Sequence, residues 1–126
     1  MTILMTSIYV NDSIKAFSFY TEILGFEKLL FIPEQKLAII VSHEQPKGTS
    51  LLLEPNDNPI AKNYQQALYS EGLPVIILGT EDINIEYDRL EKLGVIFKSR
   101  PISSEWGLDA FFEDTCGNWI QLHQQN

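Results

Sequence analysis

Few side chains in this chain are of types suited to nucleophilic attack, proton transfer or tight metal binding. The sequence holds one cysteine and two histidines. Cys116 has no base close to it in sequence, and a single cysteine excludes an intrachain disulfide and a thiolate-rich metal site. His43 lies beside the turn at 45–48 and is expected to face solvent, whereas His123 is expected to be a partly exposed residue of the last strand. Neither histidine is predicted to be catalytic.

The chain contains an internal repeat, in which two helices begin and end with the same residue types. The elements of this repeat would position a functional site. Asp12 opens the first helix and Gly25 ends it, and Asp82 and Gly94 hold the same places in the second. Short side-chain acceptors cap helix N-termini, and glycine readily adopts the left-handed conformation that ends many helices. The repeat predicts two half-modules that close around a shared cavity.

The remaining elements follow from hydrophobic periodicity. Alternation of apolar residues predicts strands, and spacing of three and four residues predicts helices. Asn58-Pro59 signals the start of a linking helix, with Asn as the cap and Pro at the first helical position. The expected strands lie near 3–10, 26–32, 37–42, 49–54, 74–79, 95–99, 108–113 and 118–123, and the expected helices at 13–24, about 59–71 and 83–93.

This order of elements predicts an α+β fold of two βαβββ modules. Each module is expected to form a curved mixed sheet with its helix on the outer face, so that the other faces line the shared cavity. The 126 residues are expected to form a single domain. Its parts are module 1 at about 1–55, the linking helix at about 59–71 and module 2 at about 73–126.

Charge and composition limit the partners. The chain has 9 basic and 17 acidic side chains, a net charge of −8 that repels nucleic-acid phosphates and anionic lipid headgroups. No stretch approaches the roughly 20 apolar residues that span a bilayer, and the first residues lack the basic region of a secretory signal. These features predict a cytoplasmic protein with no nucleic-acid and no membrane partner.

Three groups of residues carry a family resemblance that covers almost the whole chain. They are Val10-Asn11-Asp12 with the following Phe19-Tyr20 and Leu24-Gly25-Phe26; Leu93-Gly94; and the run from Asp114 to Leu122. Together they resemble the vicinal-oxygen-chelate superfamily, whose Asp-Pro-Asp-Gly-Asn run is similar to the third group. That superfamily includes glyoxalase I, extradiol dioxygenases, fosfomycin-resistance enzymes and bleomycin-binding proteins.

The resemblance also implies where a metal would bind. In metal-dependent members, four strands each contribute one His, Gln or Glu, and the matching positions here are Met5, Glu54, Pro74 and Gln121. Only Glu54 is a good hard ligand, because proline has no side-chain donor, a thioether is soft and an amide is weak. Such ions need three or more imidazole or carboxylate groups. We therefore predict no metal and no cofactor, which argues against the metal-assisted chemistry of the family's enzymes.

Strand alternation predicts the cavity lining once Glu54 and Gln121 are taken to point inward. The lining is mostly apolar and aromatic, as is common in small-molecule sites. The predicted residues are Met5, Ser7 and Tyr9; Ser50, Leu52 and Glu54; Pro74, Ile76 and Leu78; and Trp119, Gln121 and His123. Trp106 is expected to act as a lid over the ligand or to cover a sheet edge.

Each candidate residue has two readings. Glu54 is the candidate catalytic residue, as a general base or as the counter-ion of a cationic ligand, or it is a strand-end carboxylate hydrogen-bonded to its neighbours. Gln121 could orient a ligand or hydrogen-bond Glu54. Trp119 could stack on a planar ligand or pack in the core.

Three functions remain open. The leading hypothesis is a metal-free protein that binds a small apolar or aromatic molecule, cationic molecules included, in the cavity between the modules. The alternative is a lyase- or dioxygenase-type enzyme with a remodelled metal site that uses Glu54, Gln121 and His123. A regulatory protein that uses the fold only as a dimer scaffold is the third. The resemblance also implies a homodimer that involves the linking helix.

Overall fold

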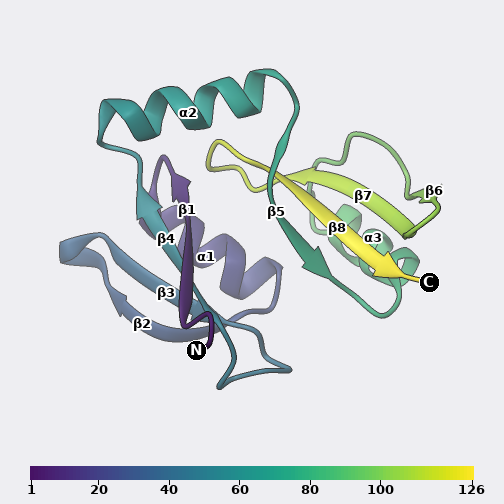
Figure 1. Ribbon diagram of the computed structural model, residues 1–126, viewed down its shortest axis with the longest axis horizontal. Coiled ribbons are helices and arrows are strands. Elements are labelled where there is room, and N and C mark those ends of the chain that lie inside the picture. Colours follow the sequence, from purple (N-terminus) through teal and green to yellow (C-terminus); the bar gives the residue numbers. More distant parts are fainter. The chain divides into compact units, whose positions relative to one another are not determined.

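The computed structural model describes residues 1–126, and the chain divides into two compact units, Met1–Gln66 and Ala67–Asn126. Each unit holds a four-stranded mixed sheet with a helix packed against it (Figure 1). The helix α2 (Pro59–Ser70) contains the boundary between the units. The predicted α+β fold of two βαβββ modules is confirmed, and the shared cavity stays a prediction. None of the helices combines the length and apolar character needed to cross a membrane.

The first unit consists of β1 (Met5–Val10), α1 (Ser13–Ser18), a π-helical turn (Phe19–Ile23), β2 (Glu27–Ile32), a 3-10 turn (Pro33–Gln35), β3 (Leu37–Val41) and β4 (Ser50–Pro55). The strand order is β1-β4-β3-β2, with β1 parallel to β4 and the other pairs antiparallel. α1 packs on β3 and β4. The fully buried core includes Val10, Tyr20, Ile40 and Leu53, so one face of this sheet is sealed by apolar contact.

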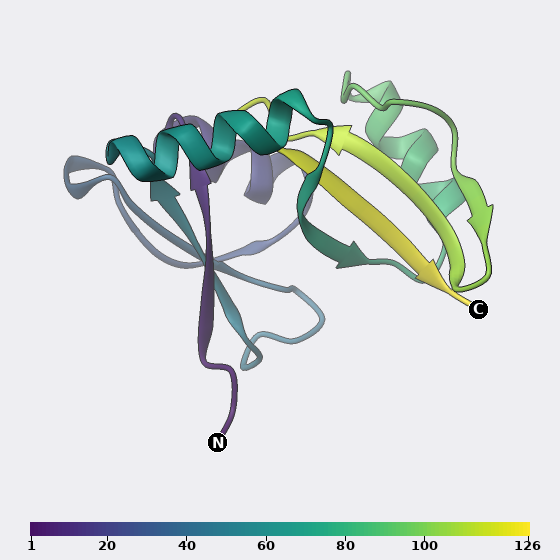
Figure 2. The same cartoon turned by 45° about the horizontal axis from the view of Figure 1, so that its top comes forward.

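The second unit consists of β5 (Pro74–Gly79), α3 (Ile83–Lys92), β6 (Ile102–Ser104), β7 (Gly107–Glu113) and β8 (Trp119–Gln125). Its strand order, β5-β8-β7-β6, repeats the plan of the first sheet, again with one parallel pair. Figure 2 shows α3 behind β7 and β8, the two strands on which it packs. Leu90, Phe112 and Ile120 are buried there. Below, the face of each sheet opposite α1 or α3 is called its far face.

The strand expected near 95–99 is interrupted. Phe97 forms only an isolated bridge with Phe112, and the edge strand β6 lies at 102–104, where we expected a loop. Both segments pair with β7, because Lys98 N–H donates to the carbonyl of Phe111 and Ile102 lies opposite Asp109. Between them stands Pro101, which has no N–H to donate to a ladder. The predicted position of the edge strand was therefore wrong.

The helix signals of the sequence have the predicted structural roles. Asp12 Oδ1 accepts hydrogen bonds from the backbone N–H groups of Ile14 and Lys15 at 3.1 and 3.0 Å. Asp82 caps α3 in the same way. Gly25 and Gly94 have φ values of +88° and +89°, which a residue with a Cβ adopts only with strain. The two helices therefore share the same N-terminal capping and the same left-handed C-terminal glycine, as well as the same residue types.

The Asp-Thr-Cys-Gly-Asn turn sets the start of β8. Asp114 is fully buried, and its Oδ1 accepts from the backbone N–H groups of Cys116 at 2.7 Å and Asn118 at 3.1 Å. The amide of Asn118 donates to Oδ2 at 2.8 Å. Cys116 is itself buried in this turn as a free cysteine. The turn thus fixes the register in which β8 presents its side chains.

We predict that Asp12→Ala lowers the free energy of unfolding by about 1 kcal/mol, because two N–H groups of the first turn of α1 lose their acceptor. Asp12→Asn keeps an acceptor oxygen and is expected to retain most of the stability. Chemical denaturation of the three proteins measures the difference. Equal losses in both variants would show that the side chain does not act as a cap.

Candidate functional site

The far face of the second sheet carries a row of polar and aromatic side chains. Ile120 and Leu122 of β8 are buried on the α3 side, so alternation directs the residues between them to the far face. The antiparallel register sets three residues of β8 against three of β7. The pairs are Trp119 with Glu113, Gln121 with Phe111, and His123 with Asp109.

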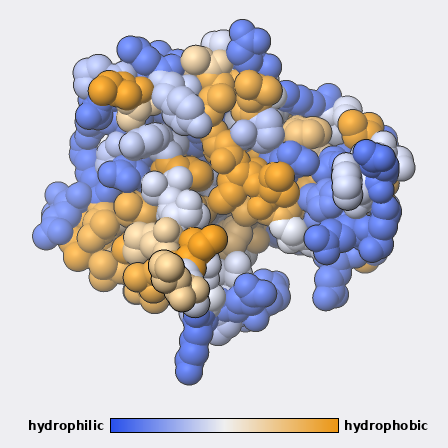
Figure 3. All heavy atoms as spheres, viewed as in Figure 1, coloured by the Kyte–Doolittle hydropathy of each residue, from blue (hydrophilic) through white to orange (hydrophobic).

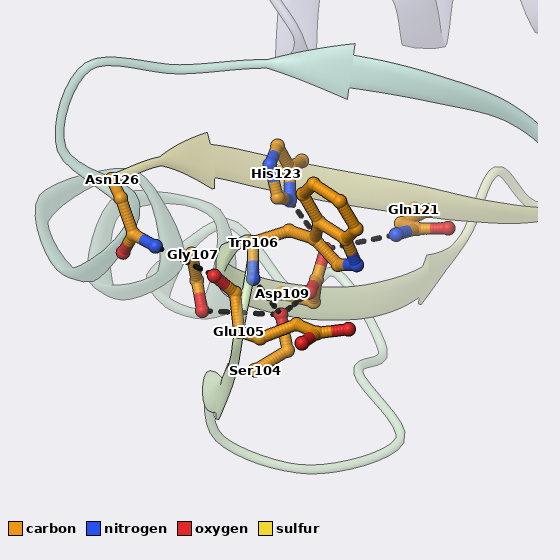
Figure 4. Close-up of polar contacts among 8 residues, drawn as sticks. All are labelled: Ser104, Glu105, Trp106, Gly107, Asp109, Gln121, His123 and Asn126. Atoms are coloured by element: carbon orange, nitrogen blue, oxygen red, sulfur yellow. Dashed lines mark hydrogen bonds and ion pairs between the residues drawn. The ribbon is translucent and has the colours of Figure 1, made fainter.

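Asp109 is the centre of a hydrogen-bond network on this face (Figure 4). Its Oδ1 accepts from Gln121 Nε2 at 2.8 Å and lies 2.7 Å from His123 Nδ1. Its Oδ2 accepts from the Ser104 hydroxyl at 3.3 Å. Three neighbours on two strands therefore hold one buried carboxylate.

The network determines the charge of Asp109. Burial by itself would raise the pKa of this carboxyl, but the hydrogen bonds from Gln121 and His123, the charge of His123 and the Ser104 hydroxyl outweigh it. The pKa of Asp109 consequently lies below its ordinary value. Asp109 is an anion at neutral pH, and its partners act as donors.

His123 is oriented by this carboxylate. An ionised carboxylate only accepts hydrogen bonds, so Nδ1 of His123 carries the proton that faces Asp109, and Nε2 is left as the second functional atom of the ring. The His123 side chain is 18% exposed. A partly exposed strand histidine was the prediction for this position, and no role was predicted for Asp109. The sequence did contain a signal for this contact. Asp109 is an acidic residue within the apolar run 108–112, and that run pairs with the strand that holds His123.

Trp119 packs inside the second unit. Its ring stacks on Tyr69 with centroids 5.8 Å apart and planes 14° apart, and Lys98 Nζ lies 4.6 Å from its centroid. Lys98 also donates to the carbonyl of Gly72 at 2.6 Å. The Tyr69 hydroxyl donates to the Glu113 carboxylate, which raises the pKa of that hydroxyl. These contacts form a rigid aromatic border to the far face.

Trp106 lies in the tight turn between β6 and β7 and is 72% exposed. In Figure 4 its indole stands in front of Asp109, between His123 and Gln121. The next residue must be glycine, because a Cβ on Gly107 would lie 1.9 Å from the carbonyl oxygen of Gln124. The backbone of the turn therefore lies against the backbone of β8 at Gln124.

The far face of the first sheet is less polar. Ile8 and Val10 are buried on the α1 side, which leaves Met5, Ser7 and Tyr9 of β1 on the far face. The parallel register places them opposite three residues of β4, namely Ser50, Leu52 and Glu54. Glu54 is half-buried and its carboxylate has no hydrogen bond or ion pair within the chain.

The predicted face of one residue in β5 was wrong. Pro74 lies opposite Trp119, but Ile77 lies opposite Gln121 and Leu78 opposite the buried Leu122. One extra residue in β5 makes a bulge between Pro74 and Ile77 and reverses the alternation after it. Leu78 therefore faces α3, and Ile77, 61% exposed, is on the far face in its place.

The donor set does not fit a divalent metal. The chain contains no group of three or more His, Cys, Asp or Glu side chains placed to hold an ion. At the four positions that the family resemblance indicates, Pro74 has no donor atom and Met5 offers a thioether. The Gln121 amide nitrogen donates to Asp109, and the amide oxygen is a weak, uncharged metal ligand. Only Glu54 supplies a charged oxygen, whereas such ions need several.

Comparison with known proteins gives a family and several relatives. The family model described as Glyoxalase/Bleomycin resistance protein/Dioxygenase superfamily matches residues 2–122. The uncharacterized protein YurT of Bacillus subtilis (strain 168) is 47% identical, over 99% of this chain and 100% of its own length.

Solved structures show the same fold. UcmS2 superimposes with a TM-score of 0.82 at 26% identity, covering 99% of this chain and 98% of its own. TnmS3, described as an antibiotic binding protein from Streptomyces sp. CB03234, has a TM-score of 0.76 at 27% identity, covering 100% of this chain and 97% of its own.

We predict that Asp109→Asn weakens the dependence of stability on acid. The pKa of Asp109 is lower in the folded than in the unfolded protein, so its contribution is complete above the ordinary value of 3.8 and is lost as the pH falls through the folded pKa. Urea unfolding between about pH 3 and pH 7 should show a smaller acid-induced loss in the variant. Asp88→Asn, on the exposed side of α3, is the control and should follow the wild type.

Proposed function

This chain belongs to the Glyoxalase/Bleomycin resistance protein/Dioxygenase superfamily, and from that premise we propose that it binds a small aromatic molecule without a divalent metal. Each sheet contributes a candidate binding surface, which is its own far face. The residues that we assign to it are Met5, Ser7, Leu52 and Glu54 of the first sheet, and Trp106, Trp119, Gln121 and His123 of the second unit. We add Ile77 and Phe111, because both lie opposite Gln121 in the strand register.

The observation that carries this proposal is the accessibility of apolar side chains on the far faces. Met5 is 41% exposed, Ile77 is exposed, and Leu52 and Phe111 are half-buried. Figure 3 shows apolar side chains gathered at the surface over β5 and over β2 and β3. Accessible apolar area with a few polar groups beside it is the usual composition of a small-molecule site.

Charge indicates which aromatic molecules fit. The net charge of −8 disfavours anionic ligands. Glu54 has no partner in the chain, so a cationic group on the ligand would pair with it without breaking an existing contact. The proposed ligand is therefore a neutral or cationic aromatic molecule, with Glu54 as counter-ion in the cationic case. The antibiotic-binding relative TnmS3 supports a binding function.

The homodimer and the cytoplasmic location stay part of the proposal. Apolar residues on the surface of α2 support a second copy as partner, since Ile60 and Tyr64 are both exposed on neighbouring turns. The negative net charge supports a protein that works away from membranes and nucleic acids.

The metal-free part of the proposal predicts that the purified protein contains no divalent metal in stoichiometric amount. Because Glu54 is the only charged donor of the set, Ni²⁺, Zn²⁺ and Mn²⁺ should not raise the melting temperature specifically. Elemental analysis and thermal-shift measurements test this. A tightly held metal that disappears in Glu54→Gln would support the enzyme with a remodelled site and overturn the proposal.

The binding part predicts that the planar cation 9-aminoacridine binds and that Ile77→Ser weakens its binding about tenfold. An apolar side chain buried against a ligand contributes about 1.5–3 kcal/mol, and a tenfold change corresponds to about 1.4 kcal/mol. Fluorescence titration measures the dissociation constants. Ile85→Ser is the matched control, because Ile85 has similar exposure but lies on α3. Equal effects of the two substitutions, or no binding, would contradict the assignment.

A further inference from the structure

We propose that Nε2 of His123 is the hydrogen-bond acceptor of a recognition subsite for aromatic molecules that carry an acidic, phenol-type hydroxyl. The inference rests on the aromatic-binding function proposed above and adds the ligand class that the second unit selects. It depends on contacts within that unit alone. Neither the family match nor the named relatives assign a role to His123 or Asp109.

The geometry of the pair makes Nε2 the available atom. Nδ1 of His123 is 2.7 Å from Asp109 Oδ1, a short contact that commits its proton to the carboxylate. Nε2 has no hydrogen-bond partner within the chain. A neutral imidazole bonded in this way presents a lone pair at Nε2, so the group that it binds must be a donor.

Asp109 is a positioning residue and does not itself contact the ligand in this proposal. Both of its oxygens are occupied, by Gln121 and His123 on one side and by Ser104 on the other. The three donors come from two strands and fix the carboxylate, which in turn fixes the imidazole plane. The subsite is therefore preorganised before a ligand arrives.

A second histidine shows what distinguishes the subsite from an ordinary surface pair. His43 lies 2.7 Å from Glu27, the same separation as in the Asp109 pair. The His43 side chain is 69% exposed and that of His123 only 18%. Water competes fully for a hydrogen bond at His43 and much less at His123. Of the two pairs, only that of His123 is shielded enough to select a ligand.

The neighbours of the subsite favour an aromatic hydroxyl over other donors. The Trp106 indole in front of Asp109 and the half-buried Phe111 offer apolar surfaces for a ring. The carboxylate of Asp109 disfavours an anionic ligand group such as a free carboxylate. A phenol meets both conditions, since it is planar, uncharged and a strong donor.

The pair can also take the proton. If the ligand O–H bond breaks, the proton forms a bond to Nε2, and the products are a phenolate and an imidazolium whose Nδ1–H still donates to Asp109. No other reactant takes part. The contact between Nδ1 and Asp109 Oδ1 is kept on both sides of this transfer, so the imidazole stays in place when the proton moves.

The test uses 7-hydroxycoumarin and 7-methoxycoumarin, which have the same ring system and differ in the donor proton. The full-length protein is expected to bind the hydroxy compound about tenfold more tightly, as one hydrogen bond in a shielded site allows. The absorption of bound 7-hydroxycoumarin is expected to shift toward that of its anion. Fluorescence and absorbance titrations measure both effects.

Three variants separate recognition from folding. His123→Leu should abolish the preference and the spectral shift while 7-methoxycoumarin still binds, and Asp109→Asn should reduce both effects because the imidazole loses its fixed orientation. His43→Leu is the matched control and should behave as wild type.

Two results would overturn the inference. Equal affinity of the two coumarins for the wild type, or a preference that survives in His123→Leu, would contradict the subsite and leave the aromatic-binding function standing. Failure of both coumarins and of 9-aminoacridine to bind would overturn the proposed function and this inference together.

Discussion

In each unit of this protein, one helix covers one face of the sheet. Because strand side chains alternate between the two faces, this constraint assigns strand residues to one of two environments. Residues such as Leu53 and Phe112 are sealed between sheet and helix. Their sequence neighbours are directed to the far face, where the helix cannot cover them. The candidate ligand-binding residues are thus a consequence of how the core is built.

Polar groups on the far face of the second sheet satisfy one another. Asp109 is held by three hydrogen-bond donors, from Gln121, His123 and Ser104. A buried carboxylate is costly unless hydrogen bonds compensate it, and here three do. This arrangement commits the amide nitrogen of Gln121 to Asp109 and fixes the orientation of that side chain.

Local signals in the sequence predicted most of the fold because their causes are local. Asp12 and Asp82 cap helices through atoms two or three residues away, and Gly25 and Gly94 adopt left-handed conformations that depend on their own backbone. The predicted position of the edge strand and the predicted face of Leu78 were wrong, because both depend on how one strand pairs with another. Nothing near β5 in the sequence reveals a bulge that is defined only against β8.

The sequence by itself determined the two repeated modules, the family, the negative charge and the shortage of metal donors, since each follows from residue types and short spacings. With Glu54 and Gln121 taken as inward residues from the family resemblance, alternation also placed Trp119 on the far face. Only the tertiary structure joined Asp109 to His123, two residues 14 positions apart. That contact requires the register between β7 and β8, which the hydrogen bonds of the whole hairpin set and which no single residue encodes.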